Sequence, residues 1–108
     1  MSNVQLSRAA TAATQAPAEG PIKLHGPDAF EGMRRAGLLA AEALDMLVPW
    51  VKPGVSTQRL DDLVLEFALD RKATPAPLYY RGFPRAICTS INHVVCHGIP
   101  TERKVLLD

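Results

Sequence analysis

The chain lacks any long apolar run, and it has few cysteines, few aromatic residues and almost no net charge. No run of about 18 apolar residues is present, which argues against a membrane-spanning helix. The formal charge of +1, from 12 basic and 11 acidic residues, gives no electrostatic reason to expect a nucleic-acid partner. Two cysteines without a secretory signal indicate free thiols in a reducing, cytoplasmic compartment. The 47% apolar content that remains is typical of a globular protein.

Residues 1–21 differ in composition from the rest of the chain. Ala, Thr, Ser, Gln and Pro dominate there and show no hydrophobic periodicity, which predicts a disordered extension. Arg8 and the absence of any acidic residue before Glu19 are also compatible with a mitochondrial transit peptide, and this alternative stays open. Residues 22–108 are predicted to form the ordered part.

The first predicted helix opens at Pro27-Asp28 and runs to about Val48, where Pro49 ends it. Small and apolar residues recur at three- and four-residue steps along it, which indicates one buried face. This stripe consists of Phe30, Met33, Gly37, Ala40, Leu44 and Leu47.

A second helix is predicted from a cap at Ser56 or Thr57 to about Lys72. Two prolines shortly afterwards prevent its continuation. Its buried face is predicted to be formed by Leu60, Leu63, Val64 and Phe67. Its solvated face is predicted to be formed by Asp61, Asp62 and Glu66.

Residues 87–97 alternate apolar and polar side chains on either side of Asn92-His93, which predicts a β-hairpin. A two-residue loop at Asn92-His93 would place Cys88 opposite His97 and on the same face. A three-residue loop would instead bring Cys88 opposite Cys96, within disulfide range. We favour the two-residue loop, and a thiol or redox hairpin remains a possible interpretation.

Cysteine and histidine cluster in this hairpin, so a metal site and a thiol nucleophile both need consideration. A zinc site built from Cys88, His93, Cys96 and His97 lacks the usual short ligand spacings. Strand alternation would also place Cys96 and His97 on opposite faces. A Cys88–His97 nucleophile pair is geometrically possible but has no visible orienting Asn or Asp.

Two longer runs resemble one enzyme family. They are Tyr80-Arg-Gly-Phe-Pro84 and Cys88-Thr-Ser-Ile-Asn-His-Val-Val-Cys-His-Gly-Ile-Pro100. Together with Met33-Arg-Arg-Ala-Gly37 and Val51-Lys-Pro-Gly-Val-Ser56, they are similar to type I methionine aminopeptidases of the bacterial kind. The resemblance covers roughly residues 22–108. It implies an α+β fold, the N-terminal portion of a pita-bread fold, in which two helices pack on a curved antiparallel sheet.

The resemblance also implies a function. Members of the family remove the initiator methionine from nascent proteins that have a small second residue. The implied partners are therefore nascent polypeptide N-termini at the ribosome, with the full-length protein expected to be a monomer. A non-catalytic pita-bread binding protein, which keeps the scaffold without the metal site, is the alternative from another class.

The resemblance assigns roles to four residues. His97 matches the histidine that hydrogen-bonds the substrate near the scissile peptide, and Tyr80, Phe83 and Cys88 match the pocket for the methionine side chain. Without the resemblance, the sequence favours a hydrogen-bonded hairpin histidine at position 97 and core packing of the other three residues. The chain departs from the family at three positions. Many relatives carry tyrosine in place of Phe83, histidine is common in place of Arg81, and some relatives carry cysteine in place of Pro77.

The family uses two divalent metal ions (Co, Mn, Fe or Zn), whose five ligands would all fall beyond Asp108. The resemblance therefore predicts no metal ligand within the chain. Residues 1–108 alone are expected to carry part of the substrate pocket and to be inactive.

Overall fold

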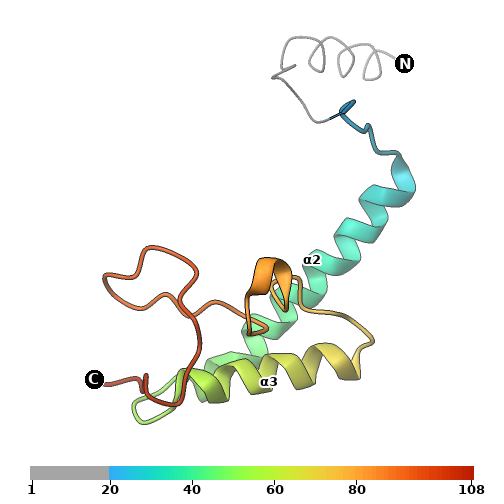
Figure 1. The fold of residues 1–108 in the computed structure, drawn as a ribbon. Coiled ribbons are helices and arrows are strands. Elements are labelled where there is room, and N and C mark those ends of the chain that lie inside the picture. Colours follow the sequence, from blue (N-terminus) through green and yellow to red (C-terminus); the bar gives the residue numbers. More distant parts are fainter. Residues whose placement is uncertain (1–19) are drawn as a thin grey trace. The chain divides into compact units, whose positions relative to one another are not determined.

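The computed structural model describes residues 20–108, whose course is shown in Figure 1. In chain order they form the helix α2 (Pro27–Leu47), the short 3-10 helix η1 (Val48–Trp50), the helix α3 (Thr57–Asp70) and the 3-10 turn η2 (Tyr80–Gly82). They fall into two compact units, one ending at Ala36 and the other running from Gly37 to Asp108. The predicted extension and the transit-peptide alternative concern residues that, apart from 20 and 21, lie outside the described part. None of the helices described is long and apolar enough to cross a membrane.

Helix α2 has the extent that its periodicity predicts. Pro27 opens it, with φ already fixed near the helical value, and the Gly26 carbonyl accepts hydrogen bonds from the Ala29 and Phe30 amides. The predicted burial is wrong for most of its stripe, since Phe30 and Leu44 are 67% and 68% exposed. An amphipathic face is buried only where another element packs against it. Of the predicted stripe, only Leu47 is buried.

Helix α3 also matches its prediction, and Ser56 is its N-cap. The Ser56 hydroxyl accepts a hydrogen bond from the Arg59 amide at 3.1 Å, which satisfies one of the free donors of the first turn. Leu60 and Leu63 pack with Leu47 in the core of the second unit. Partly buried side chains surround this cluster, namely Met46, Val55, Val64, Ile87 and Leu106.

The predicted hairpin is confirmed at its turn and wrong in its strands. The Val94 amide donates to the Ile91 carbonyl at 3.1 Å and Asn92 has φ 54°, so the loop has two residues. Thr89 then bonds to Gly98, two positions beyond the partner that a regular ladder requires. The shift coincides with His97, whose left-handed φ of 53° interrupts the extended arm.

The expected curved antiparallel sheet is not seen in residues 20–108. The described residues contain no strand, and their only β pairing is an isolated antiparallel bridge between Ser56 and Val105. A two-stranded hairpin is marginal by itself in water, because it has few ladder bonds and little apolar area to bury. The segment after η2 is therefore organised by other contacts, which come from α3.

Candidate functional site

A hollow of about 650 Å³ lies in the second unit. Its lining is mostly apolar, and it comes from residues 76–84 together with three positions farther along the chain. The structure brings together on this lining all four residues singled out from the sequence: Tyr80, Phe83, Cys88 and His97. An open apolar hollow of this volume is large enough for a side chain of a peptide ligand.

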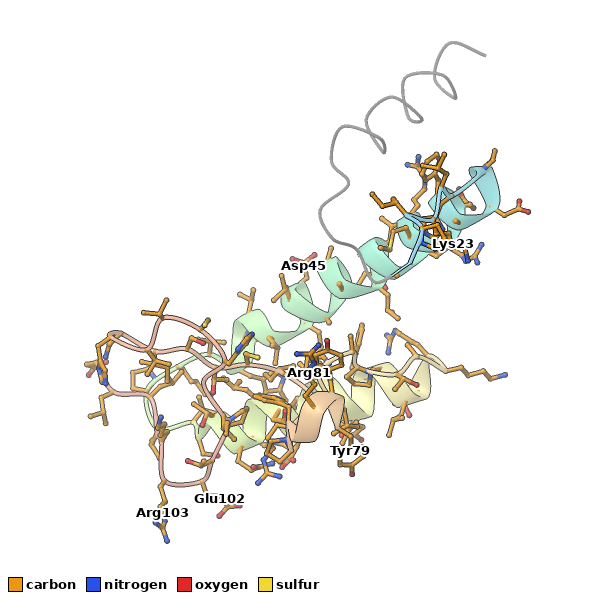
Figure 2. The ribbon with its side chains drawn as sticks, turned by 45° about the horizontal axis from the view of Figure 1, so that its top comes forward. Lys23, Asp45, Tyr79, Arg81, Glu102 and Arg103 are labelled. Atoms are coloured by element: carbon orange, nitrogen blue, oxygen red, sulfur yellow. The ribbon has the colours of Figure 1, made fainter. Side chains whose placement is uncertain are left out.

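The turn η2 supplies the aromatic part of the lining. Tyr79 and Arg81, on either side of Tyr80, have left-handed φ values of 64° and 48°. Such conformations cost a non-glycine residue about 1–3 kcal/mol and persist only where the surroundings impose them. Here the Tyr79 amide bonds to the Phe83 carbonyl at 2.8 Å, and the Phe83 amide bonds to the Tyr80 carbonyl at 2.9 Å. Both bonds close the turn, on which Tyr79 and Arg81 are labelled in Figure 2.

A close backbone crossing brings Cys88 and His97 to the same hollow. The Thr89 amide donates to the Gly98 carbonyl at 2.8 Å, and the Gly98 amide donates to the Ser90 hydroxyl at 3.1 Å. A Cβ atom at Gly98 would lie 2.1 Å from the Thr89 carbonyl oxygen, so only glycine permits this approach. Cys88 and His97 immediately precede Thr89 and Gly98, the two residues that cross. The crossing therefore fixes the backbone positions from which both side chains extend.

Asp61 anchors the chain just before Cys88, and here the sequence interpretation was wrong. The Asp61 side chain was assigned to the solvated face of α3, yet it is only 3% exposed. Its Oδ1 accepts hydrogen bonds from the backbone amides of Ala86 and Ile87, at 2.8 and 2.9 Å. Asp62 is exposed, as expected. The carboxylate of Asp61 therefore fixes the two residues immediately before Cys88.

Thr57 anchors the other end of the same segment. Its hydroxyl donates to the Thr101 carbonyl and accepts from the Thr101 amide, both at 2.9 Å. The Thr57 amide also bonds to the Lys104 carbonyl at 2.8 Å. Next to the two anchors, Arg85 Nε donates to the Pro100 carbonyl at 3.2 Å and joins the two ends of the segment directly. Residues from the first two turns of α3 thus hold both ends of the segment that carries Cys88 and His97. This segment comes after α3 in the chain and is coloured orange to red in Figure 1.

A signal for these anchors is present in the sequence. Thr57, Asp61, Val64 and Ala68 follow one another at three- and four-residue steps, so they lie on one face of the helix. That face is the one that contributes Leu60 to the core. The charge of Asp61 was interpreted as an indication of solvent exposure. Its position on the same helix face as Thr57 instead indicates burial against the later part of the chain.

The side chains described here do not fit a metal ion. Within residues 20–108, no three His, Cys, Asp or Glu side chains lie close enough together to hold one. This includes the four-residue zinc site considered above. Cys88 and Cys96 are both exposed free thiols, so the disulfide that a three-residue loop would allow is not formed.

The chain belongs to metallopeptidase family M24, whose family model matches residues 31–108. Among individual proteins, it is similar to the methionine aminopeptidase of Rickettsia prowazekii, with 56% identity over 82 residues. That match covers 76% of this chain and 32% of the relative. The resemblance noted in the sequence motifs is thereby confirmed.

Solved structures give the same result. The crystal structure of the Rickettsia prowazekii methionine aminopeptidase matches with a TM-score of 0.76, over 80% of this chain and 34% of that one. The methionine aminopeptidase of Thermotoga maritima matches with the same TM-score at 33% identity, over 81% of this chain and 35% of that one. The chain spans about a third of the length of the relatives that it matches.

Proposed function

We propose that this chain forms the methionine-binding side of the active site of a metal-dependent methionine aminopeptidase. The enzyme would remove the initiator methionine from proteins whose second residue is small. One observation carries the proposal: the four residues that the family resemblance assigns to substrate binding all line one hollow. Membership of a metallopeptidase family and similarity to methionine aminopeptidases over most of the chain support the reaction class.

The chemistry of the hollow suits a thioether. Tyr80 and Phe83 offer aromatic surface and Cys88 offers a polarisable thiol, all three on the same lining. Methionine sulfur makes favourable contacts with aromatic rings, of about 0.3–1.5 kcal/mol each. The hydroxyl that many relatives carry at position 83 is absent here, so Phe83 contributes only apolar surface to this wall. The side chain of methionine would therefore enter between these three residues.

His97 would act on the peptide that follows the methionine. His97 lies on the lining of the same hollow as the aromatic residues, and it is exposed. A hydrogen bond to the scissile peptide favours reaction if it strengthens as negative charge develops on the carbonyl oxygen. Polarising and positioning the substrate is the role proposed for His97, and no proton transfer is assigned to it.

The proposal includes two divalent metal ions (Co, Mn, Fe or Zn), which in this family supply the activated hydroxide. Residues 20–108 offer no ligand cluster that fits them. No step is therefore assigned to a metal held by these residues. A preparation of residues 1–108 alone is proposed to bind peptides that begin with methionine without cleaving them. The curved antiparallel sheet of the pita-bread fold is proposed to form only with further strands, for the reason given above.

The proposed cellular setting follows from the substrate. Initiator methionine is present on nascent chains, so action on polypeptide N-termini at the ribosome, by a monomer in the cytoplasm, is part of the proposal. Nucleic acid is not proposed as a ligand, because a net charge of +1 gives little electrostatic attraction to it.

The proposed function can be tested by titrating the ¹⁵N-labelled chain with three peptide amides that differ only in their first residue. Met-Ala-Ser amide should shift the amide signals of residues 80–83 and 88. The norleucine analogue, which has the same shape without sulfur, should bind somewhat more weakly, and Ala-Ala-Ser amide should not bind. Equal binding of all three would contradict a methionine pocket.

Activity is tested in the same samples after addition of Co²⁺ or Mn²⁺. Residues 1–108 should release no methionine from the peptide. Cleavage by this preparation, or tight binding of two metal ions, would contradict the division of roles proposed here. Methionine-specific binding that persists in a longer, metal-loaded polypeptide without cleavage would favour the binding-protein alternative.

A further inference from the structure

One charged side chain stands on the lining of the otherwise uncharged hollow. Apart from His97, the residues that line it with Arg81 are apolar, aromatic, glycine, proline or cysteine. The Arg81 guanidinium carbon lies 5.3 Å from the centre of the Tyr80 ring. Within residues 20–108, no carboxylate forms an ion pair with Arg81. The only ion pair in that part of the chain joins Arg34 to Glu31.

Other arginines of the same unit have structural partners. Arg85 donates to the carbonyl of Pro100, which holds the segment carrying His97. Arg71 donates to the carbonyl of Phe67 and lies over its ring, at the end of α3. Arg81 makes no comparable side-chain hydrogen bond within the described residues, so its donors remain available.

The position of Arg81 is fixed more firmly than its exposure suggests. The bonds between Tyr79 and Phe83 hold its backbone in the left-handed conformation. A guanidinium over an aromatic face is restrained by the attraction between the cation and the ring. It then presents a planar fork of N–H donors, whose geometry matches both oxygens of a carboxylate. The hollow thus carries a partly preorganised anion-binding group at its edge.

The ammonium group of a peptide N-terminus would be repelled by Arg81. The complementary group must therefore be an anion farther along the peptide. We propose that Arg81 binds a carboxylate of the peptide substrate, so that peptides with an acidic residue soon after the small second residue are preferred. This inference deepens the proposed function and rests on it. The carboxylate could belong to an acidic side chain or to the C-terminus of a short peptide.

Four peptides separate these cases in titrations of the ¹⁵N-labelled chain. Met-Ala-Asp-Ser amide and Met-Ala-Ser-Asp amide are compared with Met-Ala-Asn-Ser amide, a neutral peptide of the same shape. Met-Ala-Asn-Ser with a free C-terminus tests the terminal carboxylate. Exposed ion pairs are weak and screened by salt, so we expect the acidic peptides to bind about three- to fivefold more tightly at low salt. The advantage should disappear in about 0.5 M NaCl.

Substitutions assign the effect to Arg81. Arg81→Gln should abolish the preference, and Arg81→Lys should keep part of it, because it retains the charge without the fork. Arg103→Gln is the matched control, since it changes the net charge equally. Arg103 is exposed, lies outside the lining, and stands well apart from Arg81 in Figure 2.

Each outcome decides between the two proposals. A preference that survives Arg81→Gln, or that Arg103→Gln removes equally, overturns the inference. If the neutral peptide amide binds and neither the acidic peptides nor the free acid binds more tightly than it does, the inference fails and the methionine pocket stands. If no methionine peptide shifts the signals of the hollow, the proposed function fails first. A gain for the free acid alone supports a carboxylate site and assigns it to the peptide terminus.

Discussion

Replacing Asp61 by alanine should release the chain that leads into the hollow. The substitution removes the acceptor of two hydrogen bonds, from the Ala86 and Ile87 amides. The Ala86 residue is only 2% exposed, so water cannot easily replace the lost partner. A hydrogen bond to a charged group contributes about 1.5–3 kcal/mol, and removal of the carboxylate also removes its own desolvation cost. We therefore expect the free energy of unfolding to fall by about 2–4 kcal/mol.

The neighbouring residue provides the control. Asp62→Ala removes only a surface hydrogen bond from Gln58, at 2.9 Å, and should change the free energy of unfolding by less than about 0.5 kcal/mol. Asp61→Asn keeps an oxygen that can accept both bonds but loses their charge assistance, so its effect should be intermediate. Urea unfolding followed by circular dichroism measures all three variants.

A second readout separates anchoring from general stability. In Asp61→Ala, the amide signals of residues 86–88 should shift and the binding of Met-Ala-Ser amide should weaken. In Asp61→Asn, both should stay near those of the unsubstituted chain. If Asp61→Ala does not fold, the contrast between Asp61→Asn and Asp62→Ala still decides. Equal, small effects at positions 61 and 62 would refute the anchoring role.

Substitutions at three further positions test two residues that support the hollow and one that lines it. Thr57→Val keeps the volume but removes both hydrogen bonds to Thr101, so urea unfolding should show a loss of about 2–3 kcal/mol, whereas Thr57→Ser should show little. Gly98→Ala would place a Cβ against the Thr89 carbonyl, so it should abolish methionine-peptide binding in the same titrations; unchanged binding would contradict the crossing. In a metal-loaded polypeptide that contains this chain, His97→Ala should lower kcat about 100-fold, with metal affinity measured by calorimetry nearly unchanged; equal losses would count against its role.

The helices could be predicted because their determinants are local. The periodicity of residues 27–48, the Ser56 cap and the prolines that follow α3 each act within a few positions of the chain. The loop at Asn92-His93 belongs to the same class, since asparagine tolerates the positive φ that the turn requires. The four site residues were instead named through the family resemblance of the motifs that contain them, since local pattern alone did not distinguish them from structural residues.

The strands and the anchors could not be predicted as easily, because they depend on distant partners. Thr89 bonds to Gly98 next to a left-handed His97, a conformation that is uncommon for residues other than glycine and that no neighbouring residue indicates. Asp61 reaches across 25 residues to Ala86, and Thr57 across 44 to Thr101. The sequence interpretation placed Asp61 on the solvated face and considered Thr57 only as a cap, because nothing near either residue indicates the distant partner that it meets.

These long-range bonds explain how an exposed site can have a defined geometry. Tyr80 and His97 are exposed, so the packing of their own side chains contributes little to their positions. Their order must come from the backbone, which the bonds of η2 hold at Tyr80 and which Asp61 and Thr57 hold on either side of His97. Because both anchors lie in the first two turns of α3, the cap at Ser56 is coupled to the hollow, although it does not line it. Loss of that cap should therefore weaken peptide binding together with stability, whereas a change at the far end of α3 should affect stability alone.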